Sequence, residues 1–218
     1  MHDLPGQDAD AAIADLERAI SLGPEHVSWY ELTLEPNTVF YADPPTNLPD
    51  DDERLAIETR GRELLSEAGY ERYEVSAYAR SGRECRHNLN YWHFGDYIGI
   101  GAGAHGKRST LTNIVRSIRP AHPRAYMAYA ENEADAAPDR PLDESERLFE
   151  YMLNALRLES GFDEREFSER ARLDPEHLAA RAGPAVEKGL IARSESGLWA
   201  PTALGRRFLN DLVSGFLP

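Results

Sequence analysis

The sequence contains a single cysteine, Cys85, among its 218 residues. Iron–sulfur clusters are held by several cysteine thiolates, so this chain has no cysteine cluster with which to hold one. The N-terminus also lacks the basic and apolar regions of a signal peptide. One unpaired cysteine without an export signal is typical of a reducing compartment, and we therefore expect a cytoplasmic protein.

Positive charge is scarce as well, and so are long apolar stretches. Arginine and lysine number 24 against 38 acidic residues, which gives a net charge of −14, and Lys107 and Lys188 are the only lysines. Because nucleic acids and anionic membranes are themselves polyanions, this balance argues against non-specific binding to either. No apolar run approaches the ~20 residues of a membrane span. We expect no nucleic-acid partner and at most transient contact with membranes.

The composition of the chain is that of a globular protein. Hydrophobic residues make up 41% of the chain, with three Trp, ten Tyr and seven Phe. The length suits one large domain or two small ones, and chains of this size bury roughly 70% of their unfolded surface. The sequence therefore predicts a sizeable hydrophobic core.

The first half of the chain alternates between helical and strand patterns. Apolar spacing and capping residues predict helices over 11–22 and 53–68, and buried strands over 26–34 and 73–78. The proline-bearing segment 35–49 between them is predicted to be irregular. Alternating helices and strands build a parallel sheet with helical crossovers, so we expect an α/β fold here.

The pattern changes after a polar, small and proline-bearing stretch over 130–141, which has the composition of a linker. Helices, then a hairpin, then a helix capped by Thr202 resemble a winged-helix module. The predicted elements are helices over 144–159, 162–173 and 175–181, hairpin strands over 189–193 and 198–200, and a last helix through Leu212. The pair Arg206-Arg207 on that last helix is interpreted as surface solvation rather than a DNA-reading face.

A polar and aromatic cluster, Cys85-Arg86-His87-Asn88-Leu89-Asn90-Tyr91-Trp92, follows directly after a predicted strand. In α/β barrels the active site lies at the carboxyl ends of the strands, so the position favours a binding site. Two other interpretations stay open. The imidazole of His87 is equally suited to a structural hydrogen bond, and Tyr91 with Trp92 to capping the open end of a sheet.

A glycine-rich turn follows a short apolar strand predicted over 97–100. Gly101-x-Gly103-x-x-Gly106 matches the dinucleotide-binding fingerprint literally, but that fingerprint requires a helix directly afterwards. Residues 107–116 are polar and β-rich instead. The glycines are better explained by close approach of the backbone to a ligand or to a neighbouring strand.

Other candidate residues are weaker. His87, His93 and His105 offer no pair with the helical spacing of a zinc motif. Glu35 and Glu74 are carboxylates suited to proton transfer, but a solvated or salt-bridged acid is the favoured interpretation of both.

Five segments, taken in order, resemble a known family. His26–Leu32, Glu35–Thr38, Gly69–Ser76, Cys85–Trp92 and Gly95–His105 are similar to the HemW branch of the radical SAM superfamily, long described as oxygen-independent coproporphyrinogen III oxidase-like. The signature His-Asn-x-x-Tyr-Trp is carried by His87, Asn88, Tyr91 and Trp92. Residues 148–217 resemble the C-terminal domain of the same family, so the similarity covers essentially the whole chain.

The resemblance implies a fold and a division into domains. It implies the C-terminal part of a radical SAM partial (β/α)6 barrel, followed by a small helical, winged-helix-like domain. Residues 1–129 would form the barrel part with the signature segment, 130–141 a linker, and 142–218 the C-terminal domain.

The resemblance also implies cofactors and site residues. It implies a four-iron four-sulfur cluster, S-adenosylmethionine, heme as cargo, and possible transfer of heme to a heme-accepting protein. Heme binding would fall to the signature residues, with His87 as an iron ligand, and no catalytic residue is assigned. S-adenosylmethionine would be approached by Glu31, Leu32, Thr33, Gly101, Ala102, Gly103 and Ala104.

The departures from the family are equally specific. The cluster-binding Cys-x-x-x-Cys-x-x-Cys is missing from this chain, and Met1 falls where relatives are in mid-barrel. We therefore expect a C-terminal fragment or one part of a split protein, and whether this chain is an enzyme stays open. The leading hypothesis is a heme chaperone. The alternatives are an oxygen-independent coproporphyrinogen III oxidase and a non-catalytic porphyrin-binding fragment.

Overall fold

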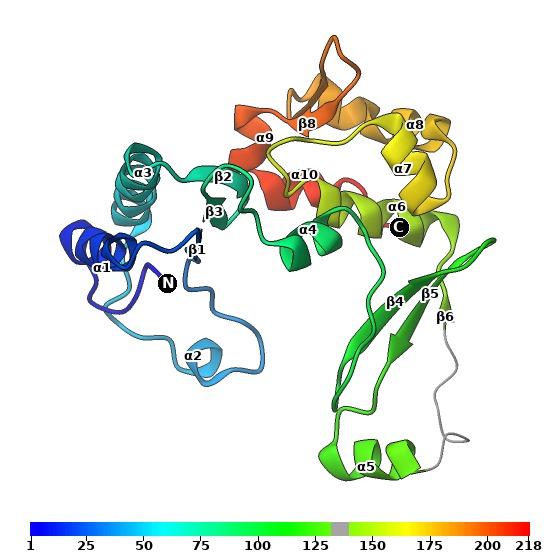
Figure 1. Cartoon of the computed structure of the whole chain (residues 1–218), viewed down its shortest axis with the longest axis horizontal. Helices are drawn as coiled ribbons and strands as arrows, with labels where there is room; N and C mark the ends of the chain where they lie inside the picture. The colour runs from blue at the N-terminus through cyan, green and yellow to red at the C-terminus, as the bar shows by residue number, and fades with distance from the viewer. Residues whose placement is uncertain (132–139) are drawn as a thin grey trace. The chain divides into compact units, whose positions relative to one another are not determined.

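The computed structural model describes residues 1–131 and 140–218. The chain folds into two compact units, Met1–Cys85 and Arg86–Pro218 (Figure 1). Most of the linker predicted over 130–141 lies outside the described residues, so the predicted boundaries at 129 and 142 remain predictions. Among the helices described, none is both long enough and apolar enough to cross a membrane.

Two helices of the first unit lie side by side, α1 (Ala9–Ser21) and α3 (Asp51–Glu67) (Figure 1). Both are fixed at their N-termini by acidic caps. The Asp8 carboxylate accepts from the backbone N–H of Ala11, and Asp50 forms a reciprocal capping box with Glu53. Both helices were predicted from these caps and from their apolar spacing, and the prediction is confirmed.

The sheet of the first unit differs from the one predicted. Strands β1 (His26–Ser28), β2 (Glu71–Glu74) and β3 (Ala77–Ala79) lie in the order β1-β3-β2, and both pairings are antiparallel. The prediction of parallel pairing was wrong here, because the predicted strand over 73–78 turns at Val75-Ser76 and folds back as a hairpin. The predicted strand over 26–34 is also shorter. The segment predicted to be irregular includes a single-turn helix, α2 (Val39–Ala42).

The core of the first unit gathers where α1 and α3 cover this sheet. Its buried members are Ala12, Leu16, Val27, Trp29, Ile57, Leu65, Tyr70 and Tyr78. Trp29 fills the space beside Gly61, where a Cβ would lie 1.8 Å from the indole Cη2. The helices and the sheet are therefore joined by close contact between an indole and a bare helix backbone.

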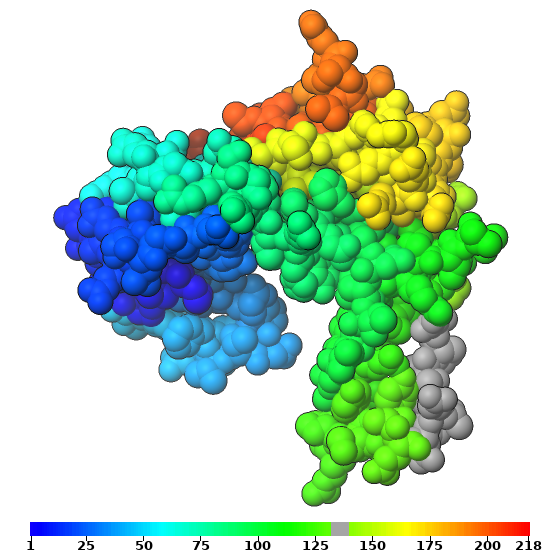
Figure 2. Space-filling model, in the orientation of Figure 1, coloured from blue at the N-terminus to red at the C-terminus, as the bar shows by residue number. Residues whose placement is uncertain are grey.

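The second unit begins with a short helix, α4 (Arg86–Trp92), and a three-stranded antiparallel sheet in the order β4-β5-β6. The sheet consists of β4 (His105–Ser109), β5 (Ile114–Ile118) and β6 (Arg140–Pro141). The prediction of a strand over 97–100 was wrong, because this segment forms only an isolated bridge from Tyr97 to Lys107. The side chains of Ile98 and Ile100 are exposed. The β4–β5 hairpin and α5 (Pro123–Glu131) extend from the rest of this unit (Figure 2).

The remaining elements match the winged-helix-like pattern predicted for the C-terminal part. They are α6 (Glu144–Ala155), α7 (Glu164–Ala171), α8 (Pro175–Glu187), the hairpin of β7 (Ile191–Arg193) and β8 (Trp199–Pro201), α9 (Ala203–Arg207) and α10 (Leu209–Ser214). Thr202 caps α9 through its hydroxyl, as predicted, by accepting from the N–H of Gly205 at 3.0 Å. The last predicted helix is broken at Phe208.

The core of the second unit is built around Tyr151. Its ring makes edge-on contacts with the rings of Phe94, Phe162 and Phe167, at centroid distances of 5.9, 5.2 and 5.1 Å. Each such contact contributes about 0.5–1.5 kcal/mol of stabilisation beyond that from the burial of apolar area. Phe94 follows α4 directly in the chain, so this aromatic core also anchors the end of α4.

Candidate functional site

The four signature residues lie on α4, where the polar cluster forms a helix rather than a loop. Residues four apart share a face of a helix, so His87 lies with Tyr91 and Asn88 lies with Trp92. The His87 side chain is exposed, and its ring meets that of Tyr91 edge-on at a centroid distance of 4.9 Å. The structure therefore presents an imidazole to solvent beside an aromatic ring.

An aromatic row continues from this face. The rings of Tyr91 and Tyr97 are 4.6 Å apart, and the Tyr97 hydroxyl accepts a hydrogen bond from Arg116. Arg116 also donates from Nε and Nη2 to Glu150 Oε2, at 2.9 and 2.6 Å. Burial alone would lower the pKa of Arg116, but these contacts with Glu150 raise it above its ordinary value. The charged guanidinium thus holds the far end of the row in place.

The segment after α4 is fixed by a buried ammonium group. Phe94 adopts a left-handed conformation with φ of 52°, which ends the helix. Lys107 Nζ lies 4.0 Å from the Phe94 ring centroid, and it donates to the Phe94 carbonyl at 2.8 Å and to Asp96 Oδ1 at 3.0 Å. Desolvation lowers the pKa of Lys107, since its side chain is almost completely buried.

Asp96 is the counterion of that ammonium group. Burial by itself would raise the pKa of Asp96, but hydrogen bonds from the Ser109 N–H at 2.8 Å and from Lys107 lower it below its ordinary value. The hydrogen bonds among Lys107, Asp96 and Ser109 tie the loop after α4 to strand β4.

Two more contacts anchor the C-terminal end of α4 itself. His93 Nδ1 lies 2.6 Å from Glu166 Oε1 on α7. The Arg157 guanidinium lies over the Trp92 ring, 4.6 Å from its centroid. The signature helix is short, but its C-terminal end is held by Arg157, by Glu166 on α7 and by the aromatic core around Tyr151.

The glycine turn at Gly101–Ala104 contains two glycines with positive φ, a backbone conformation that favours glycine. Gly101 and Gly103 have φ of 107° and 73°, which side-chain-bearing residues rarely adopt. The Gly101 N–H donates to the Tyr126 hydroxyl at 3.1 Å, and the Gly103 N–H to the Pro120 carbonyl at 2.9 Å. Strand β4 follows this turn, where the dinucleotide-binding fingerprint requires a helix.

The other candidates for S-adenosylmethionine lie beyond β1 in the first unit. Glu31 lies 3.9 Å from Arg54, the Leu32 N–H donates to the His2 carbonyl, and the Thr33 hydroxyl donates to Glu35 at 2.8 Å. The structure brings the four heme candidates together on one helix. It places Glu31–Thr33 and the glycine turn in two different compact units.

An iron–sulfur cluster does not fit this chain. Cys85 is its one cysteine, whereas a cluster of this family requires three thiolates. In the parts of the chain that the structure describes, no three His, Cys, Asp or Glu side chains gather in a way that could hold a metal ion.

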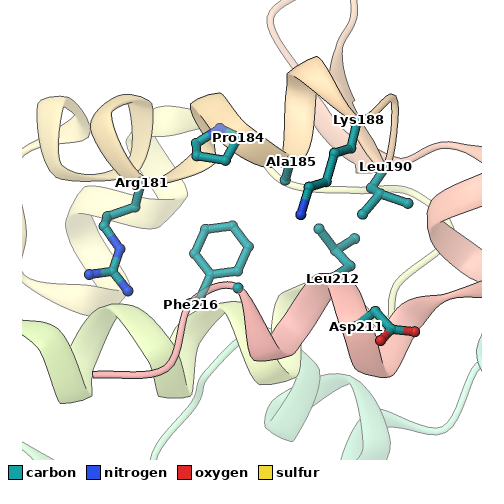
Figure 3. A pocket seen from close by; sticks show the side chains of 9 residues that line it. Arg181, Pro184, Ala185, Lys188, Leu190, Asp211, Leu212 and Phe216 are labelled. Carbon is teal, nitrogen blue, oxygen red and sulfur yellow. The ribbon is translucent and has the colours of Figure 1, made fainter.

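A small hollow lies between α8 and α10, lined by Arg181, Lys188, Leu212 and Phe216 among others (Figure 3). Its volume is about 50 Å³, well below the roughly 300–1,000 Å³ of typical ligand pockets. A large flat ligand therefore has no place there, and the exposed face of α4 is the stronger candidate.

Sequence reasoning missed the residues that support α4, namely Tyr97, Lys107, Arg116 and Arg157, and missed Tyr126, which supports the glycine turn. Each acts through partners up to 65 positions away in the chain, as Arg157 does on Trp92. The one available signal was the rarity of lysine, since Lys107 is one of only two in the chain.

Comparison with known proteins identifies the family of the chain. The family described as HemN C-terminal domain matches residues 142–208. The chain is 43% identical to the heme chaperone HemW of Escherichia coli and 42% identical to that of Haemophilus influenzae, over all of this chain and 56% and 55% of those proteins. A mouse mitochondrial protein, radical S-adenosyl methionine domain-containing protein 1, is 41% identical over 48% of this chain and 24% of its own length.

One solved structure shares the fold. Coproporphyrinogen III oxidase (HemN) from Escherichia coli, described as a radical SAM enzyme, superposes with a TM-score of 0.70 and 17% sequence identity. The match covers 99% of this chain and 53% of that one. The chain thus spans about half the length of the relatives that it matches, with a HemN C-terminal domain near its end. It belongs to the HemW-like family of radical SAM proteins related to coproporphyrinogen III oxidase, and corresponds to the C-terminal portion of that fold.

Proposed function

We propose that this chain binds heme on the exposed face of α4 and acts in heme delivery to a heme-accepting protein. The observation that carries the proposal is the exposed His87 imidazole beside Tyr91, in a chain 43% identical to a protein named heme chaperone HemW. A chaperone must bind its cargo and also release it. A surface helix offers a ligand site that an acceptor protein can approach.

The chemistry of α4 suits this role. A neutral imidazole donates a nitrogen lone pair to heme iron, and His87 is free to turn because its side chain is exposed. Tyr91 and Tyr97 supply aromatic surface against which a flat macrocycle packs. Arg116 fixes the hydroxyl end of Tyr97, so this surface is ordered before any ligand arrives.

We propose a separate role for Glu31, Leu32, Thr33 and Gly101–Ala104 in contacting S-adenosylmethionine. Glycine backbone has no side chain and so permits close approach of a ligand, which supports the glycine turn as a candidate. The partner cofactor, a four-iron four-sulfur cluster, needs more thiolates than the single one that Cys85 could supply. The test is S-adenosylmethionine binding by a chimera that joins the remaining part of the Escherichia coli relative to this chain. Unchanged affinity after Gly101→Val and Gly103→Val would contradict the role.

A second candidate function is porphyrin binding without radical chemistry. It is favoured by the single cysteine, since binding through α4 requires no cluster. Both functions share the same heme site, so one experiment addresses that site for both.

The experiment is a titration of the purified chain with hemin, followed through the Soret band. We expect saturable binding with a shifted band in the unmodified chain, and loss of that shift in His87→Ala. His122→Ala is the matched control, because His122 is also exposed in the second unit but lies outside α4. Absence of a Soret shift in the unmodified chain, or an equal shift in His87→Ala, would overturn the proposed site.

A further inference from the structure

One long stretch of this acidic chain contains no acidic residue. From Tyr97 to Ala130 the sequence has five arginine or lysine residues and neither aspartate nor glutamate, whereas the rest of the chain has 19 bases against 38 acids. The stretch includes β4, β5 and α5, which extend from the rest of the second unit (Figure 2). Residues 97–130, which we call the basic arm, therefore form a positively charged projection.

Arg119 is a cation of the basic arm that is ordered without a carboxylate. Lys107 and Arg116 are held by ion pairs to acids outside the arm. Arg119 forms no ion pair within residues 1–131 and 140–218. Its guanidinium lies over the Tyr129 ring, 5.0 Å from the centroid, and its Nε donates to the Gly99 carbonyl at 3.4 Å. Because a guanidinium has five N–H groups, Arg119 keeps donors with which to bind a carboxylate.

Exposed apolar side chains flank the carbonyl that Arg119 contacts. Ile98 and Ile100, on either side of Gly99 in the chain, are 82% and 84% exposed. Arginine and tyrosine are enriched where proteins bind one another, and apolar side chains fill the centres of such interfaces. The set of Ile98, Ile100, Arg119 and Tyr129, which we call the Arg119 surface, therefore has the composition of a protein–protein interface.

Charge narrows the class of partner further. A positively charged surface favours an anionic partner. Nucleic acids are held mainly through phosphate contacts from charged and polar groups, which give the exposed isoleucines no role. An anionic membrane is an extended plane, and it repels the remainder of a chain with twice as many acids as bases. An acidic patch on a protein is local, so it attracts the basic arm without facing that remainder.

We propose that the Arg119 surface docks an acidic patch of a partner protein, in which a carboxylate binds Arg119 and apolar side chains cover Ile98 and Ile100. Stacking on Tyr129 orders the guanidinium before the partner arrives, so less conformational freedom is lost on binding. Two copies of this chain that met through the same surface would place like charges together, which disfavours self-association here. None of the four residues is a heme or S-adenosylmethionine candidate, so the inference is separate from the proposed function.

The test uses two labelled acidic polymers, poly-L-glutamate and a random copolymer of glutamate and tyrosine, titrated with the full chain at low salt and without heme. We expect both to bind. The copolymer has fewer charges, but we expect it to bind more tightly because its tyrosines cover the isoleucines. Arg119→Gln should lose about tenfold in affinity for both polymers. Arg165→Gln, the matched control, removes the same charge from an exposed position on α7 and should lose less than about twofold.

A second pair of variants tests the apolar part of the Arg119 surface. Ile100→Ser should abolish the advantage of the copolymer over poly-L-glutamate. Leu22→Ser is the matched control, since Leu22 is 80% exposed but lies in the first unit, and it should leave both affinities unchanged. Equal effects of the two substitutions would contradict the apolar contact.

Further outcomes would overturn the proposal. If the unmodified chain binds neither polymer, the proposal fails without any variant, which covers the case in which Arg119→Gln does not fold. Equal losses in Arg119→Gln and Arg165→Gln would show that net charge alone is sensed. Phosphatidylglycerol vesicles and duplex DNA are titrated in parallel, and tighter binding of either, lost in Arg119→Gln, would assign the surface to another class of partner. Self-association in sedimentation that Arg119→Gln abolishes would assign it to a second copy. Because heme is absent throughout, no result here depends on His87.

Discussion

The two compact units support their candidate residues in different ways. In the second unit, α4 is joined to an aromatic core through Phe94, to α7 through His93, and to a buried ammonium group through the loop that Lys107 binds. In the first unit, Glu31–Thr33 lie beyond the end of a three-residue strand, and they contact Arg54, Glu35 and the His2 carbonyl.

This difference is informative about function. A binding site gains affinity when its residues are ordered before the ligand arrives, because less conformational freedom is lost on binding. The heme candidates have that support within their own unit. Among the candidates for S-adenosylmethionine, Glu31–Thr33 lack such support in the first unit, whereas the glycine turn is held by Tyr126 and Pro120 in the second.

The largest expected effect comes from removing the centre of the second core. Tyr151→Ala deletes a ring that contacts Phe94, Phe162 and Phe167, and truncations of buried aromatic residues cost about 3–5 kcal/mol. We expect the second unit to unfold at much lower urea concentration and α4 to lose protection from hydrogen exchange. Leu111→Ala, at a residue that is 97% exposed, should change little. An unaltered α4 in Tyr151→Ala would show that the core does not support the site.

The first unit offers the reverse change, an added methyl group. Gly61→Ala places a Cβ against the Trp29 indole, and overpacking of this kind costs about 1–3 kcal/mol. Hydrogen exchange should increase in α1 and α3 while the second unit keeps its protection. Gly183→Ala on α8 is the matched control, since a Cβ there meets nothing within 4 Å. Simultaneous loss of protection in both units would contradict the division described above.

A smaller effect is expected from the buried ammonium group. Lys107→Met keeps the apolar stem but leaves the Phe94 carbonyl without the ammonium donor and Asp96 without its counterion, at a cost of about 1–3 kcal/mol. We expect weaker hemin binding, because the segment that ends α4 loses its anchor. The double variant Lys107→Met with Asp96→Asn removes the stranded carboxylate and should recover part of the stability. A double variant less stable than Lys107→Met would argue against this ion pair.

The smallest effect is a pH dependence confined to the first unit. Burial lowers the pKa of His26, whose Nε2 lies 2.9 Å from the Tyr73 hydroxyl. In the unfolded chain His26 has its ordinary pKa of about 6.5, so it binds a proton more readily there than in the folded chain. The free energy of unfolding therefore falls as the pH drops below about 6.5. Thermal melting of the chain and of His26→Gln between pH 7.5 and 5 tests this. An identical pH slope in both proteins would exclude His26 as the cause.

Local signals in the sequence predicted the helices and their caps well. Asp50 was expected to favour the start of a helix and Thr202 to cap the last one, since each needs only neighbouring residues for this role. The strands were predicted less well, because pairing depends on distant residues. The turn at Val75-Ser76 lacks glycine and proline, so nothing in the sequence marked the hairpin that makes this sheet antiparallel.

In the candidate site, too, residues with a local signal were predicted and residues that act across the chain were not. His87 and Tyr91 were singled out by their residue types and spacing, and α4 places them in contact. The groups that support them were not predicted, because Arg157 contacts Trp92 and Arg116 contacts Glu150 only in the folded chain. A motif therefore indicates which residues are of interest, whereas the neighbours that order them follow from the tertiary structure.

The most direct test of heme binding through α4 is chemical rescue of an axial ligand. Hemin would be added to His87→Gly with and without free imidazole, and the Soret spectrum recorded against that of the unmodified chain. We predict that the variant loses the shifted band and that imidazole restores it, because the small ligand replaces the missing side chain. A His87→Gly spectrum that already matches the unmodified chain without imidazole would show that the iron is bound elsewhere.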